Sequence, residues 1–343
     1  MGSITADPPK PWIETPLIPS LELSKKAGCN IYLKLDLLQP SGSFKSRGVG
    51  NLMSLALARH PRPGTVHYFS SSGGNAGLAC ATTAATLGRP ATICVPTTTT
   101  PFMVGKIRGL GAQVIQAGEN WAAADKYLRG NLLDEDRGGV YVPPFDHPDI
   151  WAGARSVVEE IHRQMDGASG RCATPVDAIV CSVGGGGLLC GIMEGITRLK
   201  WPGGQRPRVL AMETIGAEGL HLSMKAGKVV TLAEITSLAT SLGCTRIADA
   251  AFEWAMQGGV VSGTVTDREA VEASVWFADD ARLCVEAACG AAISPVYTGE
   301  LRRLLGEGMS DEEWGGKNVV LEVCGGSNTG FAQLQEYVRK VGL

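Results

Sequence analysis

The chain has 343 residues, of which 44% are hydrophobic and 19% charged, a balance typical of a globular protein rather than a disordered one. The formal net charge is −3 and no long basic run occurs, so neither nucleic acid nor an anionic membrane is an expected partner. No stretch of about 20 apolar residues is present, so no membrane span is expected.

Ten cysteines are present, several of them in apolar stretches where a thiol behaves as a small hydrophobic group. Neither a Cys-x-x-Cys pair nor a His-Glu-x-x-His motif occurs, which argues against a disulfide framework and a structural zinc site. The segment from Met1 to Trp12 has no apolar core and does not resemble a signal peptide. We therefore expect a cytoplasmic protein with reduced thiols.

Short apolar runs that predict strands alternate along the chain with longer helical patterns. The expected strands are Asn30–Asp36, Val66–Ser71, Ala91–Pro96, Ala112–Ala117, Ala178–Val183, Arg208–Glu213 and Asn318–Cys324. The expected helices are Ser43–His60, Asn75–Leu87, Pro101–Leu110, Trp151–Met165, Leu188–Leu199, Arg246–Met256, Arg268–Ala281, Ala291–Leu305 and Asn328–Val338. This alternation predicts an α/β fold with a mainly parallel sheet, in which ligands bind where strands lead into helices.

The length favours two domains, and proline-flanked joints near Leu37–Gln39 and Pro143–Pro148 indicate where the chain passes between them. The segment between the joints has its own strand–helix rhythm. The sequence therefore predicts a small inserted domain over residues 39–146, and a large domain made of residues 1–38 and 147–343.

A run of four glycines, Gly184 to Gly187, follows one expected strand and leads into the helix expected from Leu188. Glycines leave backbone N–H groups uncovered at the positive end of a helix dipole, which is a ready site for a phosphate group. A flexible tight turn is the alternative, although four glycines in a row cost much backbone entropy for a turn alone. The Gly-x-Gly-x-x-Gly pattern cannot be placed on this loop, and no Gly-x4-Gly-Lys-Ser/Thr loop exists, so a nucleotide-binding module is disfavoured.

A second unusual joint is Ser72-Gly73-Gly74-Asn75-Ala76-Gly77, which also links a strand to a helix. Its hydroxyl and amide groups can hold an anion as small as a carboxylate. An equally good interpretation is that Ser72 or Asn75 simply caps the helix that starts there.

The third joint contains Ser43, which can cap a helix, and Lys45, which then lies in the first helical turn. The positive end of the helix dipole opposes the charge of a lysine there and favours the neutral amine, the form that makes a Schiff base. Taken alone, Lys45 would more often be a solvated surface lysine.

Together, the order and spacing of the three joints resemble the tryptophan-synthase-β type of pyridoxal-phosphate (PLP) enzymes, known as fold type II. Further segments resemble the L-serine/L-threonine dehydratases, in particular those of the animal type: Phe145–Pro148, Trp151–Gly153, Ala211–Ala217, Ser241–Gly243 and Cys324–Asn328. The resemblance runs from about Thr15 to the C-terminus. It implies two domains, each a mainly parallel twisted sheet flanked by helices, a homodimer, and removal of ammonia from L-serine or L-threonine to leave a 2-oxo acid.

The resemblance also implies roles for individual residues. Lys45 is expected to hold PLP as a Schiff base and then to take the Cα proton, with Ser72 as the second catalytic residue. The cofactor is expected to contact Phe44, Lys45, Asn75, Gly184, Gly185, Gly186, Gly187, Leu188, Ser241 and Cys324. Phe44 and Ser241 would flank the ring. The substrate carboxylate is expected on Ser72, Gly73, Asn75 and Ala76. A monovalent or divalent cation is expected on Glu213, Ala217, Leu242 and Cys244, partly through carbonyl groups.

Cys324 is expected to face the pyridine nitrogen of the cofactor. A thiol is only a weak hydrogen-bond donor, so it should leave that nitrogen unprotonated, whereas an aspartate would keep it protonated. This favours prompt loss of the β-hydroxyl group over transamination. The chain departs from the family at Ser241, where alanine is common, and at Ala287, where proline is common.

Two alternative functions stay open, and so does the preferred substrate. A serine racemase-like or D-serine-directed enzyme would need a second acid–base group, and the Ser241 hydroxyl keeps that possibility alive. A non-catalytic amino-acid or PLP sensor could dispense with Lys45, which is present here. A choice between serine and threonine does not follow, because one methyl group changes binding by only about 1–3 kcal/mol.

Overall fold

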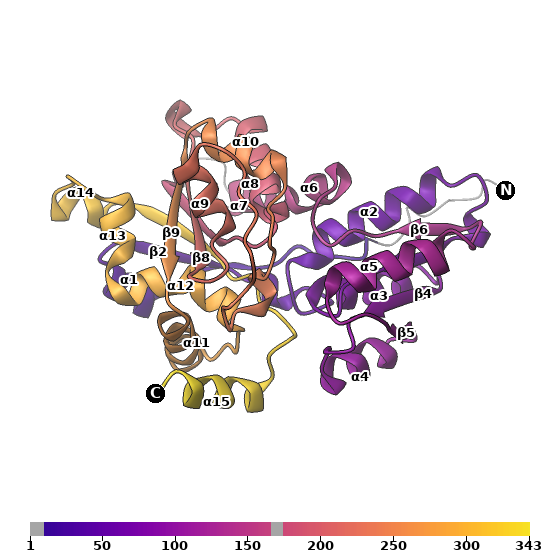
Figure 1. The fold of residues 1–343 in the computed structure, drawn as a ribbon. Coiled ribbons are helices and arrows are strands. Elements are labelled where there is room, and N and C mark those ends of the chain that lie inside the picture. The colour runs from indigo at the N-terminus through magenta and orange to yellow at the C-terminus, as the bar shows by residue number, and fades with distance from the viewer. Residues whose placement is uncertain (1–9, 166–173) are drawn as a thin grey trace. The chain divides into compact units, whose positions relative to one another are not determined.

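The computed structural model describes residues 10–165 and 174–343 (Figure 1). The chain divides into two compact units. Unit 1 comprises the described residues up to Ile13, together with Gln39–Ser41 and Lys45–Gly153. Unit 2 comprises Glu14–Leu38, Gly42–Phe44 and Ala154–Leu343.

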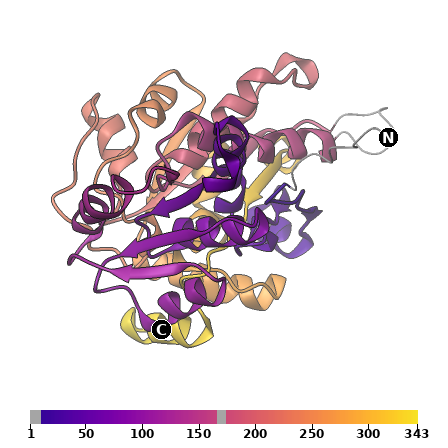
Figure 2. The same ribbon diagram turned by 90° about the vertical axis from the view of Figure 1, so that its right-hand side faces the viewer.

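Unit 1 is built on a four-stranded sheet in the order β5-β4-β3-β6, and all neighbouring strands are parallel (Figure 2). Its strands are β3 (His67–Ser70), β4 (Ala91–Val95), β5 (Gln113–Gln116) and β6 (Gly139–Tyr141). Its helices are α2 (Lys45–Arg59), α3 (Asn75–Thr86), α4 (Pro101–Gly109), α5 (Trp121–Leu128), which continues as a π-helical turn over Arg129–Leu133, and α6 (Pro148–Ala154). Every residue of β4 is buried, as expected for a central strand covered on both faces.

Unit 2 is built on a six-stranded sheet in the order β1-β2-β10-β7-β8-β9, parallel except for β1. Its strands are β1 (Leu17–Pro19), β2 (Asn30–Lys34), β7 (Ala178–Ser182), β8 (Arg208–Thr214), β9 (Val260–Val265) and β10 (Asn318–Glu322). Its helices are α1 (Leu21–Ala27), α7 (Ser156–Met165), α8 (Gly187–Arg198), α9 (Gly219–Ala226), α10 (Asp249–Met256), α11 (Asp267–Ala281), α12 (Ala287–Thr298), α13 (Glu300–Leu305), α14 (Asp311–Gly315) and α15 (Phe331–Lys340).

The buried helix α12 forms the centre of unit 2, because its residues from Ala287 to Val296 are all buried. Small side chains make this possible. A Cβ atom added to Gly290 would lie 2.1 Å from the carbonyl oxygen of Ala270, so only glycine lets α11 approach so closely. These two sheets with their helices confirm the predicted α/β fold class.

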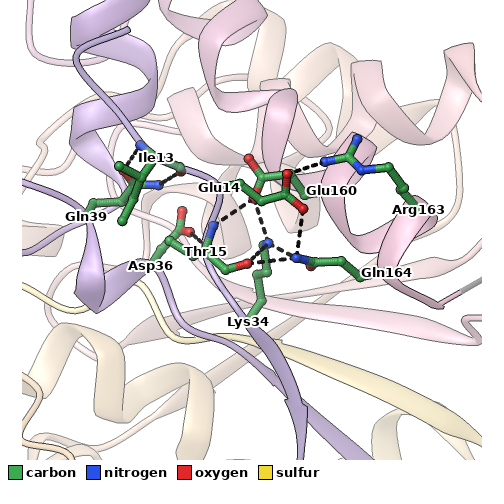
Figure 3. A network of polar contacts seen from close by, with 9 residues as sticks. All are labelled: Ile13, Glu14, Thr15, Lys34, Asp36, Gln39, Glu160, Arg163 and Gln164. Carbon is green, nitrogen blue, oxygen red and sulfur yellow. Dashed lines mark hydrogen bonds and ion pairs between the residues drawn. The ribbon is translucent and has the colours of Figure 1, made fainter. Parts of the chain in front are cut away.

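The N-terminal boundary differs from the predicted one, which put residues 1–38 in the large domain. Ile13 and Gln39 are joined by two hydrogen bonds, from Ile13 N to Gln39 Oε1 at 3.0 Å and from Gln39 Nε2 to Ile13 O at 2.8 Å (Figure 3). These bonds hold the start of the described chain in unit 1. At the other boundary unit 1 continues past the predicted end to Gly153, where a Cβ atom would lie 2.4 Å from Arg47 O.

A buried ion pair connects two distant segments of unit 2 (Figure 3). Lys34 Nζ lies 2.6 Å from Glu160 Oε2, and both side chains are buried. The same ammonium donates to the carbonyl oxygen of Thr15 at 2.7 Å and to Gln164 Oε1 at 2.9 Å. All three of its protons therefore have acceptors, as a buried charge requires.

The cysteines of the described segments are free thiols, as the sequence predicted; Cys172 lies outside these segments. Among the helices of the same segments, none combines the length and the hydropathy that crossing a membrane requires.

Candidate active site

The glycine run Gly184–Gly187 lies between the carboxyl end of β7 and the first residue of α8. Gly186 is the N-cap of α8 and has a φ of 91°, in the left-handed region that favours glycine. A Cβ atom on Gly186 would lie 2.4 Å from Ala251 Cβ, and one on Gly184 would lie 3.0 Å from Leu242 Cα. Glycine is therefore needed here for conformation and for space.

The loop is anchored so that it presents its amides at the helix start. Val183 N donates to Met212 O at 2.9 Å, and Ala248 N donates to Gly185 O at 3.0 Å. The first N–H groups of any helix have no acceptor within that helix, and here no side chain caps them. The arrangement fits a phosphate group, and the phosphate site at Gly184–Leu188 stays a prediction.

Cys324 lies just beyond the end of β10 and is buried. Its Sγ atom lies 3.5 Å from Ser182 Oγ, at the end of the neighbouring strand β7. A hydrogen bond with the Cys289 thiol, together with burial, holds the pKa of Cys324 well above its ordinary value. The thiol is therefore neutral at physiological pH, in agreement with the expected weak donor.

The segment Gly42–Phe44 is attached to the same strand end. Ser43 forms an antiparallel bridge with Gly325, and Phe44 N donates to Cys324 O at 3.1 Å. Gly42 has a φ of 75°, and a Cβ atom there would lie 2.4 Å from Ser327 Oγ. Phe44 is thus fixed beside Cys324, and Lys45 is the next residue in the chain, so its Cα lies about 3.8 Å further on.

Lys45 lies in the first turn of α2, as predicted, but the helix begins at Lys45 and not at Ser43. The Lys45 side chain is half-buried. Within unit 1 its Nζ atom donates to Pro144 O at 2.7 Å. This bond does not agree with the alternative of a fully solvated surface lysine.

The loop Ser72–Asn75 leads from β3 into α3. Gly74 is the N-cap of α3, so neither Ser72 nor Asn75 occupies the capping position that the alternative gave it. Ser72 Oγ accepts from Gly74 N at 3.2 Å, and Asn75 is buried. A Cβ atom on Gly73 would lie 2.6 Å from Thr99 Oγ1.

Asp125 in α5 supports this loop, and nothing in the sequence indicated it. Its Oδ1 accepts from Ser71 Oγ at 2.7 Å and from Tyr141 OH at 2.6 Å, and its Oδ2 accepts from Arg129 Nε at 2.8 Å. Burial and the hydrogen bond to Asp125 raise the pKa of Tyr141 to about 12, so its hydroxyl stays a donor. Ser71, which directly precedes Ser72, is thereby fixed. The contact spans 54 residues of sequence, which no local pattern can reveal.

Ser241 lies in the 3-10 turn Thr240–Leu242 and connects two other polar side chains. Its hydroxyl donates to Glu286 Oε2 at 3.0 Å and accepts from Asn328 Nδ2 at 2.8 Å. Glu286 is buried, and a Cβ atom on Gly326 would lie 1.8 Å from its Oε1. The roles of Glu286 and Asn328 were missed, although a carboxylate ahead of the apolar run Ala287–Cys289 was a usable signal.

The four predicted cation ligands lie in unit 2. Glu213 is fully buried in β8, and its carboxylate accepts from Leu220 N at 2.8 Å and from His221 N at 2.7 Å, at the start of α9. Burial raises its pKa to about 8. Ala217 and Leu242 are buried and Cys244 is half-buried. Within the described part of the chain no group of three or more His, Cys, Asp or Glu side chains is arranged to hold a metal ion.

The predicted site residues are divided between the two units. Unit 2 contains the glycine loop, Leu188, Phe44, Ser241 and Cys324. Within this unit, Gly184 lies close to Leu242, and Ser182, at the end of the strand before the loop, contacts Cys324. Unit 1 holds Lys45, Ser72, Gly73, Asn75 and Ala76.

Comparisons with known proteins identify relatives of the whole chain. Residues 10–325 match the model of a family described as "Pyridoxal-phosphate dependent enzyme". The chain is 44% identical over 331 residues to "L-serine dehydratase/L-threonine deaminase" of Bos taurus, covering 96% of each chain. A fungal L-serine ammonia-lyase from Rhizomucor miehei aligns with a TM-score of 0.85 at 34% identity, covering 96% of this chain and 99% of that chain. Maize serine racemase aligns with a TM-score of 0.80 over 96% of this chain and 92% of its own, but at 22% identity it shows a likeness of fold alone.

Proposed function

The chain belongs to the pyridoxal-phosphate-dependent enzyme family, and from this premise we propose that it is a lyase that removes ammonia from L-serine and L-threonine. The observation that carries the proposal is the glycine cradle at the start of α8, where a Cβ atom on Gly186 would meet Ala251. Such a cradle fits the phosphate group of PLP. The relatives named above, a serine dehydratase/threonine deaminase and a serine ammonia-lyase, support the reaction and the substrates.

The cofactor would be held by the residues that the resemblance to the family assigns to it. The amides of Gly184–Leu188 would bind its phosphate, Phe44 and Ser241 would lie against its ring, and Lys45 would hold it through the side-chain amine. Asn75 would donate to the ring hydroxyl oxygen. When bound, PLP withdraws electrons from the substrate Cα, which makes loss of the Cα proton and of the β-hydroxyl group possible.

The residues of the chain would supply binding, orientation and proton transfer. The substrate carboxylate would accept hydrogen bonds at Ser72, Gly73, Asn75 and Ala76, on a loop that is rigid because Ser71 is bonded to Asp125. The Lys45 amine would take the Cα proton, and positioned acid–base catalysis of this kind contributes about 10²–10⁴ in rate. Fixing the carboxylate is the condition for that transfer, since it aims the Cα–H bond at the base.

Cys324 would set the outcome of the reaction. Its thiol is held neutral by Cys289 and by burial, so it would offer the pyridine nitrogen no strong proton donor. Negative charge at Cα would then be short-lived, and departure of the β-hydroxyl group would be favoured over transamination.

Three finer points are also proposals. A cation on Glu213 and the carbonyls of Ala217, Leu242 and Cys244 rests on the resemblance of the sequence to its family. A cytoplasmic location and a homodimer rest on the resemblance of the sequence to its family. Light scattering after size-exclusion chromatography tests the dimer.

The decisive experiment follows release of 2-oxo acid from L-serine, L-threonine and D-serine by PLP-loaded protein. We expect pyruvate from L-serine and 2-oxobutyrate from L-threonine, both abolished in Lys45→Ala and unchanged in Lys106→Ala, a matched lysine on the exposed side of α4. PLP-loaded protein that releases nothing from either L-amino acid would contradict the proposal. Accumulation of D-serine from L-serine would instead identify a racemase.

A further inference from the structure

A cavity of about 110 Å³ opens in unit 2 at the edge of the sheet where the strands begin. Its walls include Ala178 and Arg208, the first residues of β7 and β8, and Val319 near the start of β10. The glycine loop and Cys324 follow the carboxyl ends of β7 and β10. Because these strands are parallel, the cavity and the candidate active site lie at opposite edges of one sheet.

The charges around the cavity are unbalanced. Three cationic side chains, Arg206, Arg208 and Lys317, line it together with a single carboxylate, Asp177, which leaves a net charge of +2. Asp177 is already engaged, since its Oδ1 accepts from Lys317 Nζ at 3.0 Å and its Oδ2 accepts from Asn318 N at 2.8 Å. The two arginines are thus left without a carboxylate partner among the cavity residues.

Both guanidinium groups have donors to spare. Arg208 Nη1 donates one hydrogen bond, to Leu305 O at 3.2 Å, and Arg206 makes no hydrogen bond or ion pair within residues 10–165 and 174–343. Pro207 between them favours extended backbone at Arg206, and residues two apart on extended backbone lie on the same side. A guanidinium presents several donors in one plane, which matches carboxylate and phosphate oxygens.

Apart from Gln205, the rest of the wall is apolar. Trp314 in α14 is buried and packs against Gly306, just after α13, and Leu305, Met309 and Val319 complete this side. A volume of 110 Å³ far exceeds the roughly 10–15 Å³ needed for one water molecule, and is below the roughly 300–1,000 Å³ of sites for drug-sized ligands. The space therefore suits a compact ligand.

We propose that this cavity, the basic cavity, binds a small organic anion with a carboxylate or phosphate head group and a short apolar body. The head group takes the open donors of Arg206 and Arg208, and the apolar body lies against Trp314. The net charge of +2 disfavours amines and metal cations. A concave apolar site with a few convergent polar groups is the arrangement that small-molecule sites share.

The test uses PLP-loaded protein, labelled with ¹⁵N at tryptophan, and follows the indole N–H resonance of Trp314 by NMR. This N–H donates to Ala27 O at 2.8 Å, so it is protected from exchange, and Trp314→Phe assigns the signal. The probes are butanoate, butyl phosphate and, as the oppositely charged control, butylammonium. We expect saturable shifts with an anionic probe and none with butylammonium, and the tighter of the two anions identifies the head group.

Two variants make the result specific. Arg206→Ala, which removes no hydrogen bond made within the described segments, should leave the fold intact and weaken anion binding by about tenfold, the usual effect of one charged hydrogen bond. Arg206→Ala/Arg208→Ala should abolish it, whereas the exposed pair Arg62→Ala/Arg108→Ala should have no effect. A Trp314 signal that neither anion moves, or that moves equally in the Arg206 variants, would overturn the proposal.

Discussion

The Ser241 hydroxyl donates a hydrogen bond of 3.0 Å to Glu286, a buried carboxylate at the start of the central helix α12. Asn328 completes the chain by donating to the same hydroxyl at 2.8 Å. The Ser241 hydroxyl is therefore part of a partly buried network of three side chains. In the proposed site it would present an ordered polar group to the cofactor ring.

This network predicts coupled stability effects. Ser241→Ala should lower the free energy of unfolding by about 1 kcal/mol, and Glu286→Gln by about 1–3 kcal/mol, because a charged acceptor is lost. The double variant should show a coupling energy of at least about 0.5 kcal/mol. Urea denaturation of all four proteins measures it, and additive effects would show that the bond contributes nothing.

The neutral thiol at the end of β10 predicts a change of reaction type. Cys324→Asp should increase transamination, seen as pyridoxamine phosphate formed during turnover of L-serine, because the negative charge of a carboxylate would keep the pyridine nitrogen protonated. Cys324→Ser is the matched control and should keep elimination dominant. The same low ratio of transamination to elimination in the aspartate variant would exclude the proposed role of the thiol.

The fixed carboxylate of Asp125 predicts a selective effect on substrate binding. Asp125→Asn removes the charge that holds Ser71, so we expect KM for L-serine to rise by about tenfold, the scale of one charged hydrogen bond, with a smaller change in kcat. Asp134→Asn, an exposed aspartate of the same unit, should change neither. Cofactor absorbance should be unchanged. A fall in kcat with KM unaltered would mean that Asp125 does not act through the substrate loop.

Much of the fold follows from local sequence because strand and helix signals here are short-range. Runs such as Ala178–Val183 and Ala91–Pro96 were correctly predicted as strands because all but one residue of each run is apolar and turn residues follow. By contrast, β1 and β6 have three residues each, too few for a periodic signal, and β9 is interrupted by Ser262 and Gly263. The predicted helix Trp151–Met165 is two helices, α6 and α7, separated at Arg155.

The residues of the candidate site also differ in how far local sequence predicts them. Clustered glycines that the backbone conformation requires, such as Gly186, can be recognised in a sequence. A run of glycines has a high cost in backbone entropy and therefore indicates a specific function. Supports such as Asp125 and Glu286 depend on partners 45 or more residues away, so only the folded chain reveals them. The placement of Ile13 in unit 1 likewise depends on one distant side chain, Gln39.

A substitution of Gly186 should have two separable effects, backbone strain and a steric clash with Ala251. Gly186→Ala places a methyl group in the left-handed region, at about 1–2 kcal/mol, and against Ala251, so both stability and PLP affinity should fall. Gly227→Ala has a similar φ of 66° but open space around it, so it should show the strain alone and bind PLP normally. Titration of apoprotein with PLP measures the affinity. Equal affinity in the two variants would contradict the phosphate cradle.

For the buried pair of Lys34 and Glu160, we expect substitution of Lys34 alone to lower the free energy of unfolding much more than replacement of both residues. Lys34→Met leaves the Glu160 carboxylate buried without its counter-charge, and such uncompensated charges destabilise by about 3–5 kcal/mol. Replacing both residues, as Lys34→Met/Glu160→Leu, removes the charge as well and should recover most of that loss. The exposed pair of Arg163 and Glu14, 2.7 Å apart, is the control, and Arg163→Ala should change stability by at most about 1 kcal/mol. Urea denaturation of apoprotein measures the stability of the single, double and control variants. A double variant as unstable as Lys34→Met would show that the fold requires the packing of Lys34 and not its charge.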